Sequence, residues 1–332
     1  MAGFGKTKEA DAELKAEKVL AETPAVQRTD ADPFAALRAE LELMDNAPMT
    51  HLFMGIAGHD NTGKTAIVTD AFSKWLAMPE RTDAEKEMQL WILDFEGGGA
   101  ANKSAFHRDN DNIKCFEPWV MMKGDSTAYN YPETHNRVMG LTQFAVDIAQ
   151  KQRDPAYDGP RLWGFHVTGV DLWDSVCINC MRIVDLNIAK DGIEAADWNK
   201  KVGHQWDWAI RKTRFHQLTG LCRGLVKAGV RVFWETHLRL TNYSWGKNEE
   251  GSSTWRPDWE KASNNFVYQL LICERNDILD DDGDIVKSQY TVRFDKSKTN
   301  ARLQGQKRTT LVTEAGKDPQ WYGLPELYDG TL

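Results

Sequence analysis

From about residue 50 onward, hydrophobic residues fall into short runs that alternate with longer stretches in which apolar and polar positions mix. Short apolar runs without regular polar alternation are typical of strands buried on both faces. Five such runs occupy residues 51–57, 89–95, 112–118, 162–171 and 230–238. The sequence therefore predicts at least five buried strands.

Between these runs, hydrophobic positions recur at helical spacing. Residues 64–77 form one such stretch directly after the first predicted strand. Two more are marked by Val138, Leu141, Ala145 and Ile148 and by Phe215, Leu218, Cys222 and Leu225. Strands that alternate with helices favour right-handed crossovers, so we expect an α/β fold whose mostly parallel central sheet carries helices on both faces.

The two ends of the chain differ from this pattern. Residues 1–47 alternate acids, lysines and alanines around Pro24 and Pro33, which predicts a flexible or helical N-terminal arm. Residues 241–265 are polar and predict a loop, and two later apolar runs flank Asp282-Gly283, a hairpin turn signal. We thus expect a core over 48–314 that ends in antiparallel strands, and a C-terminal tail over 315–332.

One motif names a ligand. A glycine, four residues and Gly-Lys-Thr stand between the first predicted strand and the first predicted helix, which is the setting of a phosphate-binding loop. The predicted nucleotide-binding residues, called the cradle loop below, are Gly58, His59, Asp60, Asn61, Thr62, Gly63, Lys64 and Thr65. Backbone amides and the helix N-terminus would face the phosphates. Lys64 would reach the β and γ phosphates, and the Thr65 hydroxyl would coordinate Mg²⁺.

The filling of this loop resembles that of small GTPases of the Arf type, and "DFEGG" at 94–98 contains an Asp-x-x-Gly like their second motif. A GTPase also needs Asn-Lys-x-Asp to recognise guanine. The nearest stretches, "NKSA" at 102 and "NKKV" at 199, both lack the aspartate. The roughly 270 residues that follow the cradle loop also exceed a small GTPase core.

The stretch "WILDFEGG" instead resembles the RecA superfamily of ring- or filament-forming ATPases, in which a carboxylate after this strand polarises the attacking water. The resemblance makes Glu96 the catalytic glutamate. Residues 206–237 are similar to a helix-strand unit in RecA- and RadA-related ATPases of phages, archaeal viruses or their hosts. The resemblance to the RecA superfamily implies that the strand before the cradle loop is central in the sheet, and that ATP and Mg²⁺ bind at the carboxyl ends of the strands.

The same resemblance implies further site residues. The Walker B aspartate, which binds the magnesium shell, is either Asp171, where the apolar strand stops, or Asp174, which precedes a serine as in the family. Thr236 and His237, at the polar end of "VFWETH", would sense the nucleotide state, or would only cap the strand.

A Lys-x-Lys pair, Lys296 and Lys298, follows the last apolar run. RecA recombinases place such lysines at a subunit boundary, where they reach the neighbour's γ-phosphate. Arg293 and Arg302 are alternatives, and a solvated basic turn is the simpler interpretation. The resemblance thereby implies a homo-oligomer, a ring or filament with composite ATP sites.

The expected function is Mg-dependent ATP hydrolysis coupled to DNA recombination, annealing or repair, with single-stranded DNA the expected partner. A viral DNA packaging or translocation motor and a GTPase-like regulatory switch are the alternatives. The net charge of −8 argues against a general nucleic-acid-coating protein. The loop at 241–265 nevertheless interleaves Trp245, Trp255 and Trp259 with Lys247, Arg256 and Lys261, an arrangement that can stack on single strands or form an interface lid.

The remaining composition concerns location. No run of about 18 apolar residues is present, so no membrane span is expected, and the N-terminus lacks the apolar centre of a secretion signal. Five cysteines, an odd number, suit a reducing compartment better than a disulfide scaffold. With the resemblance to viral and prokaryotic ATPases, this predicts a protein of the prokaryotic or host cytoplasm.

Overall fold

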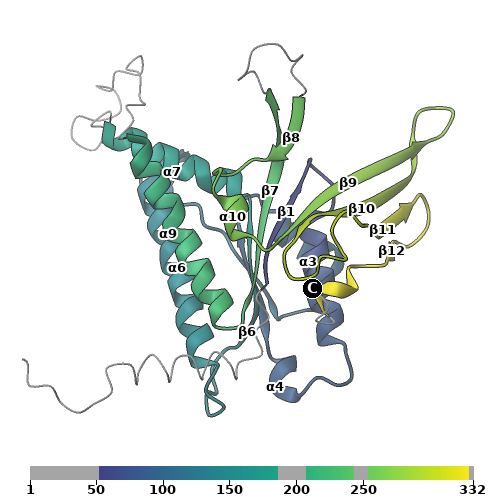
Figure 1. The fold of residues 1–332 in the computed structure, drawn as a ribbon, viewed down its shortest axis with the longest axis horizontal. Helices are drawn as coiled ribbons and strands as arrows, with labels where there is room; N and C mark the ends of the chain where they lie inside the picture. Colours follow the sequence, from purple (N-terminus) through teal and green to yellow (C-terminus); the bar gives the residue numbers. More distant parts are fainter. Residues whose placement is uncertain (1–51, 186–206, 243–252, 329–332) are drawn as a thin grey trace, which may run out of the picture. The chain divides into compact units, whose positions relative to one another are not determined.

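The computed structural model describes residues 52–185, 207–242 and 253–328, all within one compact unit. A single ten-stranded sheet organises this unit (Figure 1). Its parallel strands are β1 (Phe53–Gly58), β2 (Gln89–Asp94), β3 (Ile113–Phe116), β6 (Leu162–Thr168), β7 (Arg231–Asn242) and β9 (Gln269–Leu279). Antiparallel strands complete it, namely β8 (Ser253–Pro257), β10 (Ile285–Ser297), β11 (Lys307–Glu314) and β12 (Gln320–Trp321).

The strand order is β12-β11-β10-β9-β1-β7-β6-β2-β3, with β8 paired to β7. The cradle strand β1 therefore lies in the middle, between β7 and β9. The chain leaves β1 and returns at β2, with β7 and β6 between the two, so the strands that flank β1 come from much later in the sequence. The predicted α/β fold with a mostly parallel sheet and antiparallel C-terminal strands is confirmed.

Helices cover both faces of the sheet, as the sequence predicted. On one face pack α6 (Tyr131–Lys151), α7 (Val170–Asp185) and α9 (Asp207–Lys227), and on the other lies α3 (Lys64–Leu76) (Figure 1). Shorter elements are α4 (Asp83–Lys86), α5 (Gly98–Phe106), the hairpin of β4 (Met121–Met122) and β5 (Asp125–Tyr129), α10 (Ser263–Phe266) and the 3₁₀ turn η1 (Pro325–Leu327).

The side chains of β1 explain this layering. All six residues of the strand are buried. Phe53 and Ala57 point into the core beneath α6, α7 and α9, whereas Met54 and Ile56 point into the core beneath α3. A strand with apolar residues on both faces is stable only between two helical layers, because each face must be removed from water.

Three details differ from the sequence-based expectations. Strand β6 ends at Thr168, not at residue 171, because Gly169 adopts a φ of +64° and turns the chain directly into α7. Part of the polar stretch at 241–265 is not a loop, since β8 pairs antiparallel with β7 through the register Leu240↔Trp255. Main-chain pairing of this kind leaves no trace in a polar composition.

Beyond residue 314, β12 extends the sheet, and Leu324 and Leu327 are buried in the core beneath α3. The structure thus attaches most of the segment predicted as a C-terminal tail to the core. The predicted arm at 1–47 lies outside the described residues, as do Trp245 and Lys247. Within the described ranges, no helix is both long and apolar enough to cross a bilayer.

Candidate functional site

The cradle loop connects the carboxyl end of β1 to the first residue of α3, as the motif requires. Asn61 and Gly63 adopt positive φ values of 56° and 77°, which bend the backbone into the loop. The Lys64 side chain is buried and donates hydrogen bonds from Nζ to the carbonyl oxygens of His59 at 3.1 Å and Gly58 at 3.4 Å. The ammonium group is thereby held at the centre of the loop.

A carboxylate that was not predicted from the sequence, that of Glu235, lies beside the first turn of α3. The Thr65 hydroxyl donates to the carboxylate of Glu235, at 2.8 Å and 3.0 Å from its two oxygens. Glu235 lies on β7, where it pairs with Ile56 of β1, and only 2% of it is exposed. Its one cue in the sequence was a charged residue inside the apolar run "VFWETH". A hydroxyl beside a carboxylate is a donor set that suits Mg²⁺.

Glu96 follows β2 by two residues, as predicted, and its side chain faces the cradle loop. The main chain around it is fixed on both sides. The amide of Phe95 donates to Thr168 Oγ1 on β6 at 3.1 Å, and Asp94 accepts a hydrogen bond from the amide of Ala100 in the first turn of α5 at 2.9 Å. Gly97, with a φ of +74°, is the residue directly before α5.

The pKa of Glu96 is raised from its usual 4.5 to about 7. Burial is the largest cause, and repulsion from the Glu235 and Asp171 carboxylates adds to it, whereas His237 and Lys64 act in the opposite direction. A carboxylate with a pKa near the working pH is suited to accept a proton from water.

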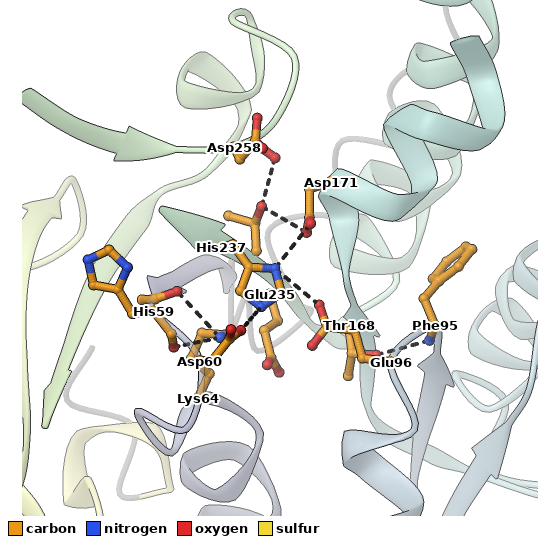
Figure 2. Close-up of polar contacts among 12 residues, drawn as sticks. His59, Asp60, Lys64, Phe95, Glu96, Thr168, Asp171, Glu235, His237 and Asp258 are labelled. Carbon is orange, nitrogen blue, oxygen red and sulfur yellow. Dashed lines mark hydrogen bonds and ion pairs between the residues drawn. The ribbon is translucent and has the colours of Figure 1, made fainter. Parts of the chain in front are cut away.

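His237, at the end of the predicted strand, joins several acidic residues (Figure 2). Its Nε2 lies 2.8 Å from Asp60 Oδ1, and its Nδ1 lies 3.1 Å from Asp171 Oδ2 and 3.6 Å from Glu96 Oε1. The hydrogen bond to Asp171 raises the pKa of the imidazole, partly opposed by burial. Neighbouring Thr236 is buried within β7, and its hydroxyl lies 2.8 Å from the carbonyl oxygen of Asp258 and 3.3 Å from Asp171 Oδ1.

The two candidate Walker B aspartates have different surroundings. Asp171 does not end a strand, since it lies in the first turn of α7, but its carboxylate belongs to the group around His237. Asp174, one turn later, accepts hydrogen bonds from the guanidinium of Arg211 on α9, with Nε at 2.7 Å from Oδ1. Among the described residues, Glu96, Asp171 and His237 are the group of acidic and histidine side chains close enough to share a metal ion.

A cleft of about 580 Å³ opens along the cradle loop, within the size range of small-ligand sites. Its polar wall is made by Asp60 to Thr65 together with Glu96, Glu235 and His237. Its other end is lined by α5, including Asn102 and Phe106. His59 faces away from the cleft and packs edge-on against Trp255 of β8, with ring centroids 4.4 Å apart.

The predicted basic pair does not line this cleft. Lys296 donates to the carbonyl oxygen of Val267 at 2.8 Å, and Lys298 to that of Asn265 at 3.3 Å. Of their alternatives, Arg293 pairs with Asp295 at 3.1 Å. Within one chain these cations therefore serve the turn after α10 and the antiparallel strands.

Comparison with protein-family models finds no match to this chain, and comparison with curated proteins finds none either.

Proposed function

We propose that this protein is a Mg-dependent P-loop ATPase of the RecA-like class whose hydrolysis is coupled to DNA recombination, annealing or repair. The observation that carries the nucleotide chemistry is the convergence of Lys64, the Thr65–Glu235 pair and Glu96 on one cleft. They come from β1, β7 and the chain after β2, which are distant in sequence; β1 and β7 are neighbours in the sheet, and β6 separates β7 from β2.

Each residue has a distinct task in this proposal. The cradle amides and Lys64 bind the phosphates, and Thr65 with Glu235 holds the magnesium ion. Bound Mg²⁺ would neutralise charge on the phosphoryl oxygens. Glu96 orients the attacking water and takes its proton, which a pKa of about 7 permits near neutrality.

His237 connects this chemistry to the strand that leaves the site. It touches Asp60 of the cradle loop and Glu96, so a movement of either residue when nucleotide binds would change a contact of β7. Beyond His237, β7 forms a ribbon with β8 on which Leu240 and Trp255 are exposed. An exposed tryptophan is a surface on which a nucleic-acid base can stack. The coupling to DNA otherwise rests on the RecA resemblance, as do the homo-oligomer and its composite ATP sites.

The test is release of phosphate from ATP and from GTP, each with no DNA, with single-stranded DNA and with duplex DNA. We expect hydrolysis of ATP that single-stranded DNA stimulates. A preference for GTP without any effect of DNA would identify a regulatory switch instead. Stimulation by duplex DNA with directional movement would identify a packaging motor. Size-exclusion chromatography with and without an ATP analogue tests the expected oligomer.

A further inference from the structure

Glu96, Asp171 and His237 lie closer together than a role of Glu96 as a proton acceptor requires. Glu96, Asp171 and His237 each offer one ligand atom, and these three atoms all lie within 4.8 Å of one another. They belong to three separate elements, since Glu96 follows β2, Asp171 begins α7 and His237 lies on β7. Two anionic oxygens and an imidazole nitrogen thus converge on one point.

The spacing of these atoms fits the coordination sphere of a transition-metal ion. Two ligands that are each about 2.1 Å from one ion are about 3.0 Å apart at a right angle and about 3.4 Å apart in a tetrahedron. The separations from His237 Nδ1 are 3.1 Å to Asp171 Oδ2 and 3.6 Å to Glu96 Oε1. An ion would also draw together the two carboxylates, which now repel one another.

The side chains next to these ligands provide the supporting contacts that metal sites use. A histidine that binds a metal through one nitrogen usually donates from the other to a carboxylate, which fixes the ring and its tautomer. His237 Nε2 has this partner in Asp60 Oδ1 at 2.8 Å. Asp171 is positioned in turn by the Thr236 hydroxyl, at 3.3 Å from Oδ1.

We propose that Glu96, Asp171 and His237 form a binding site for a divalent transition-metal ion, distinct from the magnesium site at Thr65 and Glu235. The imidazole sets the class of ion, because nitrogen ligands favour Co²⁺, Ni²⁺ and Zn²⁺ over Mg²⁺, which prefers an all-oxygen shell. Three protein ligands leave positions for water on the side of the cleft. The site does not depend on the proposed ATPase activity, because its ligand atoms converge without nucleotide.

The simpler alternative to a metal ion between these three side chains is a proton on His237 Nδ1 that is shared with the carboxylates of Asp171 and Glu96. The two occupants are distinguished by adding Co²⁺ to the full-length protein in the absence of nucleotide and following its visible absorption. We expect one Co²⁺ per chain, with the absorption of a nitrogen- and oxygen-ligated ion. A large excess of Mg²⁺ should leave this spectrum in place.

Variants locate the ion. His237→Ala should weaken Co²⁺ binding by more than about 100-fold, since it removes the only nitrogen ligand. Asp60→Asn should weaken it about 10- to 100-fold through loss of the supporting carboxylate. The Asp60 side chain is 84% exposed, so this variant tests the site even where His237→Ala does not fold. His216→Ala is the matched control, because His216 also pairs with a carboxylate, Glu260, at 3.6 Å.

The proposal is overturned if the wild-type protein binds no Co²⁺, if Mg²⁺ displaces the ion fully, or if Asp60→Asn binds as tightly as His216→Ala. These results concern metal binding alone. A protein that binds Co²⁺ at His237 but hydrolyses no nucleotide would refute the ATPase proposal and leave the metal site standing. Hydrolysis without Co²⁺ binding would do the reverse.

Discussion

In protein free of transition-metal ions, Glu96 is the residue whose ionisation should control turnover, and its pH dependence follows from the structure. Its pKa is about 7 in the folded protein, against a usual 4.5. A base with a pKa of 7 is about 9% ionised at pH 6 and about 91% ionised at pH 8, so kcat/KM should rise about tenfold over this interval. An unperturbed carboxylate would be almost fully ionised at both values and would give a flat profile.

The assay is phosphate release at saturating Mg²⁺ and low ATP, from pH 5.5 to 8.5, because kcat/KM reports the pKa of the free enzyme. Glu96→Gln should lower turnover about 10²- to 10⁴-fold. The ratio of wild type to variant at each pH removes the titration of the nucleotide itself. Glu87→Gln, at an exposed position after α4, is the matched control and should keep the wild-type profile. The assignment of Glu96 as the base would be refuted if the ratio of wild-type to Glu96→Gln kcat/KM stayed constant between pH 6 and pH 8. Full turnover by Glu96→Gln would refute it as well.

The raised pKa of Glu96 also predicts how the stability of the fold changes with pH. The folded protein retains a proton on Glu96 between pH 4.5 and about 7 that the unfolded chain has lost. The free energy of unfolding therefore falls as the pH rises through this window, and ionised Glu96 destabilises the fold above it. Glu96→Gln should unfold at a higher temperature than the wild type at pH 8, and by a smaller margin at pH 5. An equal or lower unfolding temperature at pH 8 would contradict the burial of this carboxylate.

Three further predictions test other parts of the site. Glu235→Gln should raise the Mg²⁺ concentration needed for half-maximal turnover about tenfold or more, since the Thr65 hydroxyl loses its anionic partner, and an unchanged requirement would remove Glu235 from the magnesium site. Asp171→Asn should lower kcat, because Asp171 contacts His237 in the site. Asp174→Asn should lower only the unfolding temperature, because its partner is the guanidinium of Arg211 on α9. The reverse pattern would identify Asp174 as the Walker B aspartate. Gly63→Ala should destabilise the fold by about 1–2 kcal/mol, because its φ is +77°, whereas Gly140→Ala in open space on α6 should stabilise it by about 0.5–1 kcal/mol; equal shifts in thermal unfolding would contradict the loop geometry.

Much of the fold could be predicted from the sequence because buried strands and amphipathic helices have strong periodicities. The runs at 51–57 and 89–95 correspond to β1 and β2, and the spacing of Val138 and Ile148 to α6. Pattern alone could not give the end of β6. A single glycine at 169 turns the chain there, and the apolar residues continue into α7 without a break.

The site was predictable where a short motif defines it and unpredictable where the sheet assembles it. The cradle loop follows from a local motif, and Glu96 was singled out by the resemblance of "WILDFEGG" to the RecA superfamily. Glu235 was missed because its importance depends on β7 lying beside β1, which no local pattern reveals. The sequence could not decide between Asp171 and Asp174 as the Walker B aspartate for the same reason. The partner of Asp174 is Arg211, which lies on a helix 37 residues later. The part played by Lys296 and Lys298 between subunits stays a prediction.

The most direct test of the central claim is equilibrium binding of ATP to the cradle loop in the presence of Mg²⁺. Lys64 is buried at the centre of this loop and is the cation that the phosphates would meet. The wild-type protein and the control Lys86→Ala, on exposed α4, should bind ATP with equal affinity, and Lys64→Ala should bind it at least 100-fold more weakly. Equal affinity in all three proteins, or no binding by the wild type, would contradict the account.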